Sequence, residues 1–254
     1  MQMSQFFQLK DSPYDTASTF IAGMECEIES VRSKNNFDGF EVTNDNSLRN
    51  EGVEFISFPM PAGDLLNSFK NLHAHVEYFD KSVAFSPRTS THVHVNCRTL
   101  SPDQTRQLTL FYALFEEFFF AFVEPSRRGN IHCVPLTETF LPAVYKYPIN
   151  TMVDQWHKYT ALNLIPLTKL GTIEFRHLQG TDDPVVVAQW LSCLENLWLL
   201  CQKDSISANA LTDEDRLKQW WRYIFKQCPQ ILALEPSFNN VIRNNLIDVK
   251  LSLV

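Results

Sequence analysis

The chain has 254 residues, 44% hydrophobic and 20% charged, which is enough apolar material for one large globular core. Its formal charge of −7 argues against a protein that coats nucleic acid, although a few local cations could still bind phosphate. The six cysteines form no C-x-x-C pair, and the start of the chain lacks the pattern of a signal peptide. The longest apolar run contains Glu116 and Glu117, so we expect no membrane association. Together with the scattered cysteines, this predicts a cytoplasmic protein with reduced thiols.

The first half of the chain predicts three strands and one helix. Alternating or apolar residues between turn-forming ones mark the strands, which we place at 19–31, 52–59 and 90–98. A turn over 44–52 precedes the second strand, and helical spacing predicts a helix over 63–81.

The second half predicts mainly helices. Ser101 before Pro102 is typical of a helix start and predicts a long buried helix over 101–123, followed by a loop over 124–136. A strand pair is expected next, at 156–167 and 169–181. Two further helices follow, one over 183–203 and one capped by Thr212.

Strands interleaved with long helices predict an α+β fold, a mainly antiparallel curved sheet with helices on one face. We expect a single domain over 1–254, with its motifs in a core of about 18–203 and a helical appendage over 204–254. The spacing of four tryptophans in the helical region favours a place in the hydrophobic core over a ligand-binding site: Trp190, Trp198, Trp220 and Trp221.

The first strand places three acids on one face. Strand residues two apart point the same way, so Glu25, Glu27 and Glu29 share one side while Met24 and Cys26 share the other. Three neighbouring carboxylates repel one another and are costly to bury. A solvated edge strand also tolerates them, so this strand alone leaves both interpretations open.

The same alternation recurs in two later strands. In THVHVN the polar face carries His92, His94 and Asn96. In TIEFRH it carries Thr172, Glu174 and Arg176. Glu54 is a lone acid in the apolar run GVEFISFP, where a carboxylate usually needs a partner. Each pattern alone is more typical of hydrogen-bonded or solvated side chains than of metal ligands.

If these strands share one sheet, their polar side chains gather into a site that we call the acidic cup: Glu25, Glu27, Glu54, His92, His94 and Glu174. Such a concentration of charge is stable mainly when cations neutralise it. Carboxylates with histidine and no cysteine favour Mg²⁺ or Mn²⁺ over structural zinc. The neighbouring Arg176 indicates a phosphate ligand, because guanidinium and divalent cations together stabilise phosphoryl transfer.

Six polar sequence motifs follow one another along residues 20–181. The succession of GMECEIE, DNSLRNEGVEFISFP, STHVHVN, RRGNIHCVPL, KYTALNL and TIEFRHLQGT resembles the amidoligase family, phage- and bacteria-associated members of the glutamine synthetase-like carboxylate–amine ligases. The resemblance implies a glutamine synthetase-like catalytic domain in a bacterial or phage-infected cell. It also implies amide formation through an acyl phosphate, with ATP and Mg²⁺ or Mn²⁺ and without a P-loop.

The resemblance further implies roles for individual residues. The metal ligands would be Glu25, Glu27, Glu54, His92 and Glu174. Catalytic roles would fall to Arg176 on the transferring phosphoryl group, to His94 on phosphate or substrate, and to Glu54. The nucleotide and substrate would be held by Arg127, Arg128, Lys158, Asn163 and Arg176.

The turn before Glu54 departs from the family pattern. Where the family usually has Asp-Gly-Ser, this chain reads NDNS, so Asp45 would fill the acidic place and Asn46 changes the turn. We expect Glu29 and Glu51 to be solvated rather than additional ligands, and Asn96 to be a hydrogen-bonding support.

Three functions follow from these patterns. The leading one is a ligase that joins a carboxylate and an amine on a small molecule, peptide or protein, with a glutamine amidotransferase as a potential ammonia source. A metal-dependent hydrolase built on His-x-His would need more histidines, and the others are dispersed: His73, His75, His132, His157 and His177. An inactive binding protein is the third, although the complete ligand set argues against it. The segment 137–150 is a candidate substrate loop.

Overall fold

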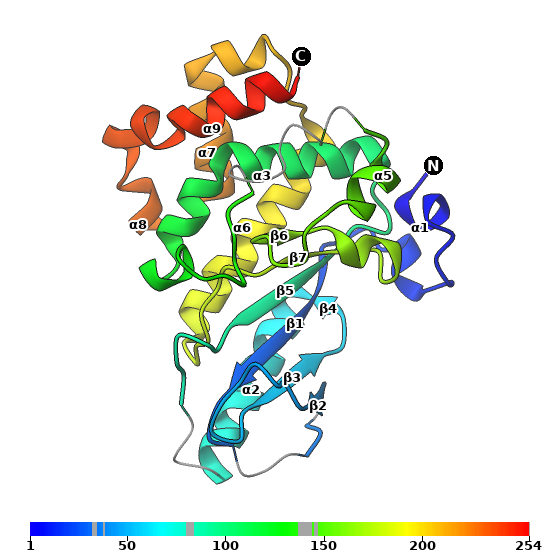
Figure 1. Ribbon diagram of the computed structural model, residues 1–254, viewed down its shortest axis with the longest axis vertical. Helices are drawn as coiled ribbons and strands as arrows, with labels where there is room; N and C mark the ends of the chain where they lie inside the picture. The colour runs from blue at the N-terminus through cyan, green and yellow to red at the C-terminus, as the bar shows by residue number, and fades with distance from the viewer. Residues whose placement is uncertain (32–34, 38, 80–83, 137–143, 145–146, 254) are drawn as a thin grey trace.

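A computed structural model describes residues 1–31, 35–37, 39–79, 84–136, 144 and 147–253. Their fold is α+β, with one seven-stranded antiparallel sheet backed by helices (Figure 1). The strands are β1 (Ile21–Ile28), β2 (Phe40–Thr43), β3 (Val53–Ser57), β4 (Met60–Pro61), β5 (Thr91–Asn96), β6 (Leu162–Asn163) and β7 (Thr172–Phe175). Their order is β2-β3-β1-β5-β7-β6, and β4 pairs with the start of β1. The predicted α+β class and antiparallel sheet are confirmed.

The helices cover one face of the sheet and extend beyond it. They are α1 (Met3–Phe6), α2 (Ala62–Phe79), α3 (Pro102–Phe122), α5 (Ile149–Asp154), α6 (Pro184–Lys203), α7 (Glu214–Ile224), α8 (Pro229–Leu232) and α9 (Phe238–Ser252). Short 3₁₀ turns join them: η1 (Pro13–Thr16), η2 (Pro125–Arg127), η3 (Ile165–Thr168), η4 (Ala210–Thr212) and η5 (Glu235–Ser237). In Figure 1, α2 lies behind the strands, and α3, α7 and α9 stack above them.

The alternation read from the sequence decides which face of the sheet is buried. Met24, Cys26, Val93, Val95 and Phe175 point into the core, and each is at most 2% exposed. Their polar neighbours along the same strands point to the opposite face. The helices therefore pack on the apolar face, and the polar face is left for a site.

Two helix starts were predicted from side chains that can accept a backbone hydrogen bond. Ser101 caps α3 as expected, accepting from the Gln104 amide at 3.1 Å. The predicted Thr212 cap of α7 is wrong, because Asp213 accepts from the Arg216 amide at 3.0 Å instead. Thr212 ends η4, where its hydroxyl donates to the Asn209 carbonyl.

The strand pair expected at 156–167 and 169–181 is much shorter than predicted. Only β6 and β7 pair, and η3 with Pro166 follows β6 directly. Proline at the start of a 3₁₀ turn cannot donate to a strand ladder, so the strand stops there. Outside β6 and β7, Thr160 and Gln179 form single bridges to Val134 and Ser90, and residues 165–168 form η3.

The C-terminal helices belong to the same hydrophobic core as α3. Phe238 of α9 stacks on Phe118 of α3, and the Asn245 amide donates to the Ala113 carbonyl at 2.8 Å. Trp190, Trp198, Trp220 and Trp221 are at most 3% exposed, as their helical spacing predicts. Residues 204–253, expected as an appendage, thus extend the main packing.

Among the helices that the structure describes, only α6 is long and apolar enough to cross a membrane. Of its apolar window, 56% is buried inside the protein, as in the core helix of a soluble domain. All six cysteines lie in the described part of the chain and are buried free thiols.

Candidate active site

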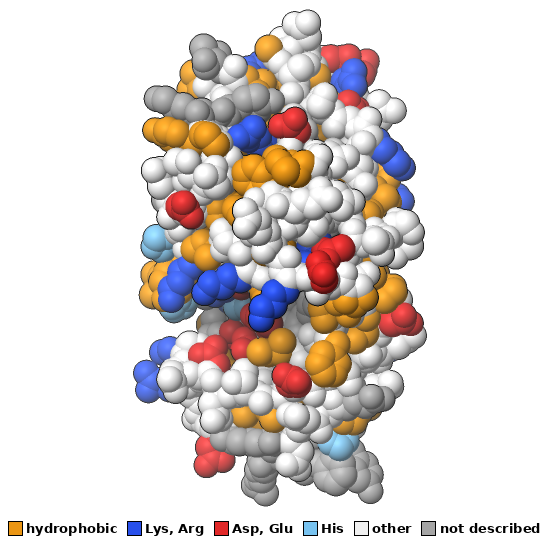
Figure 2. Space-filling model, turned by 90° about the vertical axis from the view of Figure 1, so that its right-hand side faces the viewer, with side chains coloured by type: hydrophobic (Ala, Val, Ile, Leu, Met, Phe, Trp, Pro, Cys, Tyr) orange, Lys and Arg blue, Asp and Glu red, His pale blue; other side chains and the backbone are white. Residues whose placement is uncertain are grey.

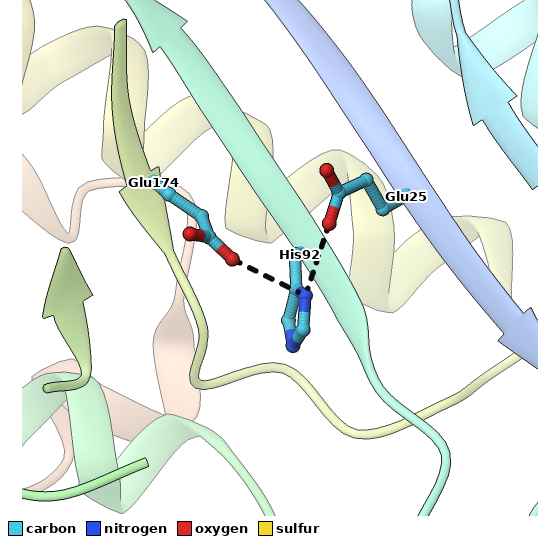
Figure 3. Close-up of side chains that lie close together, drawn as sticks. All are labelled: Glu25, His92 and Glu174. Atoms are coloured by element: carbon cyan, nitrogen blue, oxygen red, sulfur yellow. Dashed lines mark hydrogen bonds and ion pairs between the residues drawn. The ribbon is translucent and has the colours of Figure 1, made fainter. Parts of the chain in front are cut away.

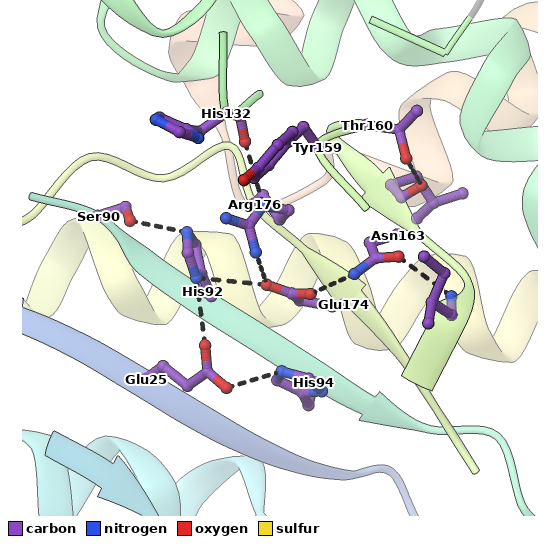
Figure 4. A network of polar contacts seen from close by, with 12 residues as sticks. Glu25, Ser90, His92, His94, His132, Tyr159, Thr160, Asn163, Glu174 and Arg176 are labelled. Carbon is purple, nitrogen blue, oxygen red and sulfur yellow. Dashed lines mark hydrogen bonds and ion pairs between the residues drawn. The ribbon is translucent and has the colours of Figure 1, made fainter. Parts of the chain in front are cut away.

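The strand register brings the acidic cup together. Antiparallel pairing sets Glu25 of β1 opposite His92 of β5, and His94 opposite Glu174 of β7. Side chains that are directly opposite on one face lie within contact distance. On the other side of β1, Glu27 lies opposite Glu54 of β3. Four strands thus deliver the six cup residues to one place, and Figure 4 shows four of them: Glu25, His92, His94 and Glu174.

The first ligand group is formed by Glu25, His92 and Glu174 (Figure 3). His92 Nδ1 lies 3.2 Å from Glu25 Oε2 and 3.3 Å from Glu174 Oε1. His92 and Glu174 are buried and Glu25 is partly exposed, so the group opens toward solvent on one side. The three side chains converge from three different strands.

The second ligand group is formed by Glu27, Glu54 and His92. Ser90 orders it, because both its amide and its hydroxyl donate to Glu27 Oε2, at 2.7 and 2.6 Å. The Ser90 hydroxyl also lies 2.7 Å from His92 Nε2. His92 therefore belongs to both groups.

The charges in the cup are out of balance without a cation. Burial and repulsion from Glu25 and Glu27 raise the pKa of Glu54 to about 8. Burial opposes ionisation of Glu25, but hydrogen bonds from His92 and His94 outweigh it and hold its pKa well below the usual range. For His94, burial lowers the pKa, yet the hydrogen bond to Glu25 prevails and raises it. A cation bound among these carboxylates would reduce their mutual repulsion.

Glu174 is fixed by two further side chains. Arg176 forms an ion pair with its Oε1, and the Asn163 amide donates to its Oε2 at 2.7 Å. The Arg176 guanidinium also donates to the His132 carbonyl at 3.1 Å, which ties the loop after η2 to the site. Glu174 therefore has its orientation set before any ligand binds.

A cavity of about 450 Å³ lies over the cup, and we call it the polar cavity. Its lining includes four acids: Glu25, Glu27, Asp45 and Glu54. Basic and aromatic side chains from the other segments complete its walls: Arg88, Arg127, His132, Lys158, Tyr159 and Arg176. In Figure 2 this hollow crosses the face of the molecule, with Lys and Arg side chains above and acidic side chains in its floor.

A second cavity of about 370 Å³ begins on the other side of Glu25, and we call it the apolar cavity. Ile21, Ile56, Pro59 and Leu170 form much of its wall. His94, bound through Nε2 to Glu25 at 3.0 Å and through Nδ1 to the Thr172 hydroxyl at 3.0 Å, lies at its border with the cup. The two cavities meet at Glu25, which lines both.

The structure places the predicted phosphate-binding residues differently. Arg176 and Lys158 line the polar cavity. Arg127 also borders it, but its guanidinium is buried and donates to the backbone carbonyls of residues 176 and 177 at 2.7 and 2.9 Å. Arg128 instead forms a bidentate ion pair with Glu117 on α3. Asn163 donates to Glu174 and is not among the residues that line the polar cavity.

The two acids expected to be solvated behave differently. Glu51 is exposed, as predicted. Glu29 is only 3% exposed, so the prediction is wrong for this residue. Its carboxylate accepts from the Arg49 amide at 2.9 Å, and this bond compensates for its burial. Glu29 thereby closes the turn that leads into β3.

Asp45 lines the polar cavity and accepts from the Ser47 amide at 2.7 Å, which forms a compact turn despite the missing glycine. The proposed substrate loop over 137–150 lies largely outside the described residues. Asn96 makes supporting bonds, donating to the Tyr14 carbonyl at 3.2 Å and accepting from the Arg98 amide at 3.1 Å.

Sequence reasoning missed several residues of the site. Ser90 had a clear signal, because it precedes His92 by two positions in STHVHVN and so shares its face. His132 and Tyr159 lie in the motifs RRGNIHCVPL and KYTALNL but were assigned no role there, and Arg88 had no signal, because all three reach the polar cavity from loops whose path depends on the whole fold.

The donor set fits a divalent cation. In each group the potential ligand atoms lie within 4.8 Å of one another. Ligands of one ion bound at about 2.0–2.6 Å have a similar spread. The ligands are mostly carboxylate oxygens with one imidazole, which favours Mg²⁺ or Mn²⁺.

Comparison with known proteins gives no independent indication of function. No protein-family model matches the chain, and no curated protein is similar to it at a significant level.

Proposed function

We propose that this protein is a glutamine synthetase-like carboxylate–amine ligase that uses ATP and Mg²⁺ or Mn²⁺ in the cytoplasm. The observation that carries the proposal is the acidic cup at the floor of a cavity whose opposite wall is basic. An acidic floor suits cations, and a basic wall suits the phosphates that those cations accompany. The family resemblance of the strand motifs supports the same reading.

The reaction is amide formation in two displacements. A substrate carboxylate oxygen forms a bond to the γ-phosphorus of ATP as the bond to ADP breaks. The amine nitrogen then bonds to the acyl carbon, the acyl carbon–oxygen bond to phosphate breaks, and the amine loses a proton. The two ligand groups of the cup would hold divalent cations, whose positive charge would offset that of the phosphates.

The residues of the chain divide this work by position. Glu25, His92 and Glu174 form one ligand group, and Glu27, Glu54 and His92 form the other. Lys158 and Arg176 face the polar cavity, where they would bind phosphate oxygens. Because Arg176 already pairs with Glu174, it is held in place for the transferring phosphoryl group.

Asn163 and Ser90 act as positioning residues, because each holds a cup carboxylate through a side-chain hydrogen bond. Arg127 supports the backbone that carries Arg176. The amine could be ammonia supplied by a glutamine amidotransferase or an organic amine.

The test is ATP consumption by the purified protein with pools of carboxylates and amines. We expect ADP and phosphate to be released only with Mg²⁺ or Mn²⁺, together with a product whose mass equals both substrates less water. Glu174→Gln and His92→Ala should lose at least a hundredfold in rate, while the matched Glu51→Gln, on an exposed turn, should keep full activity. Undiminished turnover in both cup variants would refute the site.

Thermal melting provides a second readout that needs no substrate. ATP with Mg²⁺ should raise the melting temperature of the wild-type protein, because a ligand that binds only the folded state stabilises it. No shift at any nucleotide concentration would favour a binding protein without ligase activity.

A further inference from the structure

The apolar cavity differs in chemistry from the polar cavity that adjoins it. Ile21, Ile56, Pro59 and Leu170 contribute hydrophobic surface to its walls. Two of them, Ile56 and Leu170, are 36% and 56% exposed, so their hydrophobic surface is open to a ligand. Figure 2 shows hydrophobic side chains gathered in the right-hand part of the hollow, beside the acidic floor.

Gly23 keeps this cavity open. It lies on β1 two residues before Glu25, so its missing side chain would point to the same face. A Cβ at Gly23 would meet Ser57 at 3.7 Å, which is ordinary contact, so no close approach of the backbone requires glycine there. Gly23 also has no positive φ angle that would require glycine. A larger side chain at this position would project into the cavity.

The inner end of the apolar cavity holds one carboxylate, that of Glu25. Glu25 reaches it beside His94, with Glu25 Oε1 directed at His94 Nε2. Arg98 also lines the cavity, but its guanidinium is engaged by Asp15 at 2.6 Å and by two backbone carbonyls. The other lining cation, Lys169, is exposed to solvent. An ammonium group is therefore better matched to the inner end than a carboxylate is.

We propose that the apolar cavity binds the amine substrate, a primary amine that carries an aliphatic or aromatic group. This inference rests on the proposed ligase function and gives its second substrate a chemical class. The nucleotide occupies the polar cavity, so the amine reaches the acyl carbon from the opposite side of Glu25. The hydrocarbon part packs against Ile21, Ile56 and Leu170, and the nitrogen lies near Glu25 and His94.

The first experiment measures the binding of n-alkylamines of two, four and six carbons by ligand-observed NMR, beside n-alkanoates of the same lengths. Each methylene buried in an apolar site should tighten binding about fourfold. We expect this gain for the amines and weaker binding of each matching alkanoate. Affinity that is independent of chain length, or alkanoates that bind as tightly as amines, would overturn the proposal.

The second experiment uses a matched pair of variants at Gly23. Gly23→Ala adds only a methyl group in ordinary contact and should keep hexylamine affinity within threefold. Gly23→Leu should weaken hexylamine binding at least tenfold. ATP with Mg²⁺ should still raise the melting temperature of both variants, since the polar cavity is untouched and the shift shows that each protein is folded.

The outcomes separate the two proposals. Equal hexylamine affinity in Gly23→Leu and the wild type would refute the amine site even if nucleotide binds. Chain-length-dependent amine binding that Gly23→Leu abolishes, in a protein that ATP and Mg²⁺ do not stabilise, would retain the amine site and refute the ligase.

Discussion

His92 contacts two groups of acids at once. Its Nδ1 faces Glu25 and Glu174, and its Nε2 faces Ser90, which in turn holds Glu27. An imidazole shared in this way is coupled to every carboxylate of the cup. A change at His92 should therefore affect both ligand groups, whereas a change at one carboxylate should affect mainly its own group.

This coupling predicts a pattern of Mn²⁺ binding. We expect Glu174→Gln and Glu54→Gln each to weaken Mn²⁺ binding at one group by tenfold or more, and His92→Ala to weaken it at both. The free Mn²⁺ concentration, followed by electron paramagnetic resonance during titration, measures the remaining sites. Glu51→Gln is the control. If all three cup variants lost the same number of Mn²⁺ sites, the two ligand groups would not be separate binding sites.

The local sequence predicts which face of a strand each side chain occupies, but it does not predict which strands lie next to each other in the sheet. The alternation in GMECEIE, STHVHVN and TIEFRH assigned Glu25, His92 and Glu174 to polar faces, and these three side chains do converge on one face, although most residues of the strands are buried on both. Alternation has a period of two and carries no information on which strand lies beside which. That Glu25 faces His92, and His94 faces Glu174, follows from pairing between segments far apart in the chain.

Two short strands were left undetected by the sequence. β2 and β4 have four and two residues, too few for a period to be recognised. Glu29 was misassigned for a related reason, because the amide of Arg49 that it binds lies in a turn formed only in the folded chain. Loop residues such as Arg88 and Tyr159 reach the polar cavity through tertiary structure alone.

The start of α7 allows a test at the scale of one helix. Asp213 accepts from the Arg216 amide, whereas the Thr212 hydroxyl is turned to the Asn209 carbonyl. Asp213→Ala should lower the free energy of unfolding by about 1 kcal/mol, because it removes the cap. Thr212→Ala should change it by less than about 0.5 kcal/mol. Urea unfolding measures both, and a larger loss from Thr212→Ala would reverse the assignment.

The whole molecule joins a polar site to one continuous core. α3 contacts α6 on one side and α9 on the other, and the core cluster runs from β1 to α9. The site lies on the opposite face of the same sheet, so its strands are held by packing that no site residue supplies. Substitutions in the cup should therefore alter binding more than folding, which makes the cup variants usable in solution.

The same core contains a histidine that should make stability depend on pH. His73 of α2 is 5% exposed and packs between Phe69 and Phe85. Burial lowers its pKa to about 4, although the charge of Asp182 opposes the shift. The folded protein thus keeps His73 neutral at a pH where the unfolded chain, with a pKa near 6.5, takes up a proton. Stability from this group is complete above about pH 6.5 and is lost as the pH falls toward 4.

Between pH 7.5 and pH 5 this linkage should cost the wild-type protein about 2 kcal/mol of unfolding free energy. His73→Phe keeps the ring packing and removes the titrating group, so its stability should fall by that much less over the same range. His177 is buried too, with its pKa lowered to about 3, but it is present in both proteins and cancels in the comparison. His157→Phe, at an exposed position, is the matched control and should follow the wild type. Urea unfolding at each pH measures the free energy of unfolding. If it fell equally with pH in the wild type and His73→Phe, the pKa of His73 would be the same in the folded and unfolded states, and the prediction would be wrong.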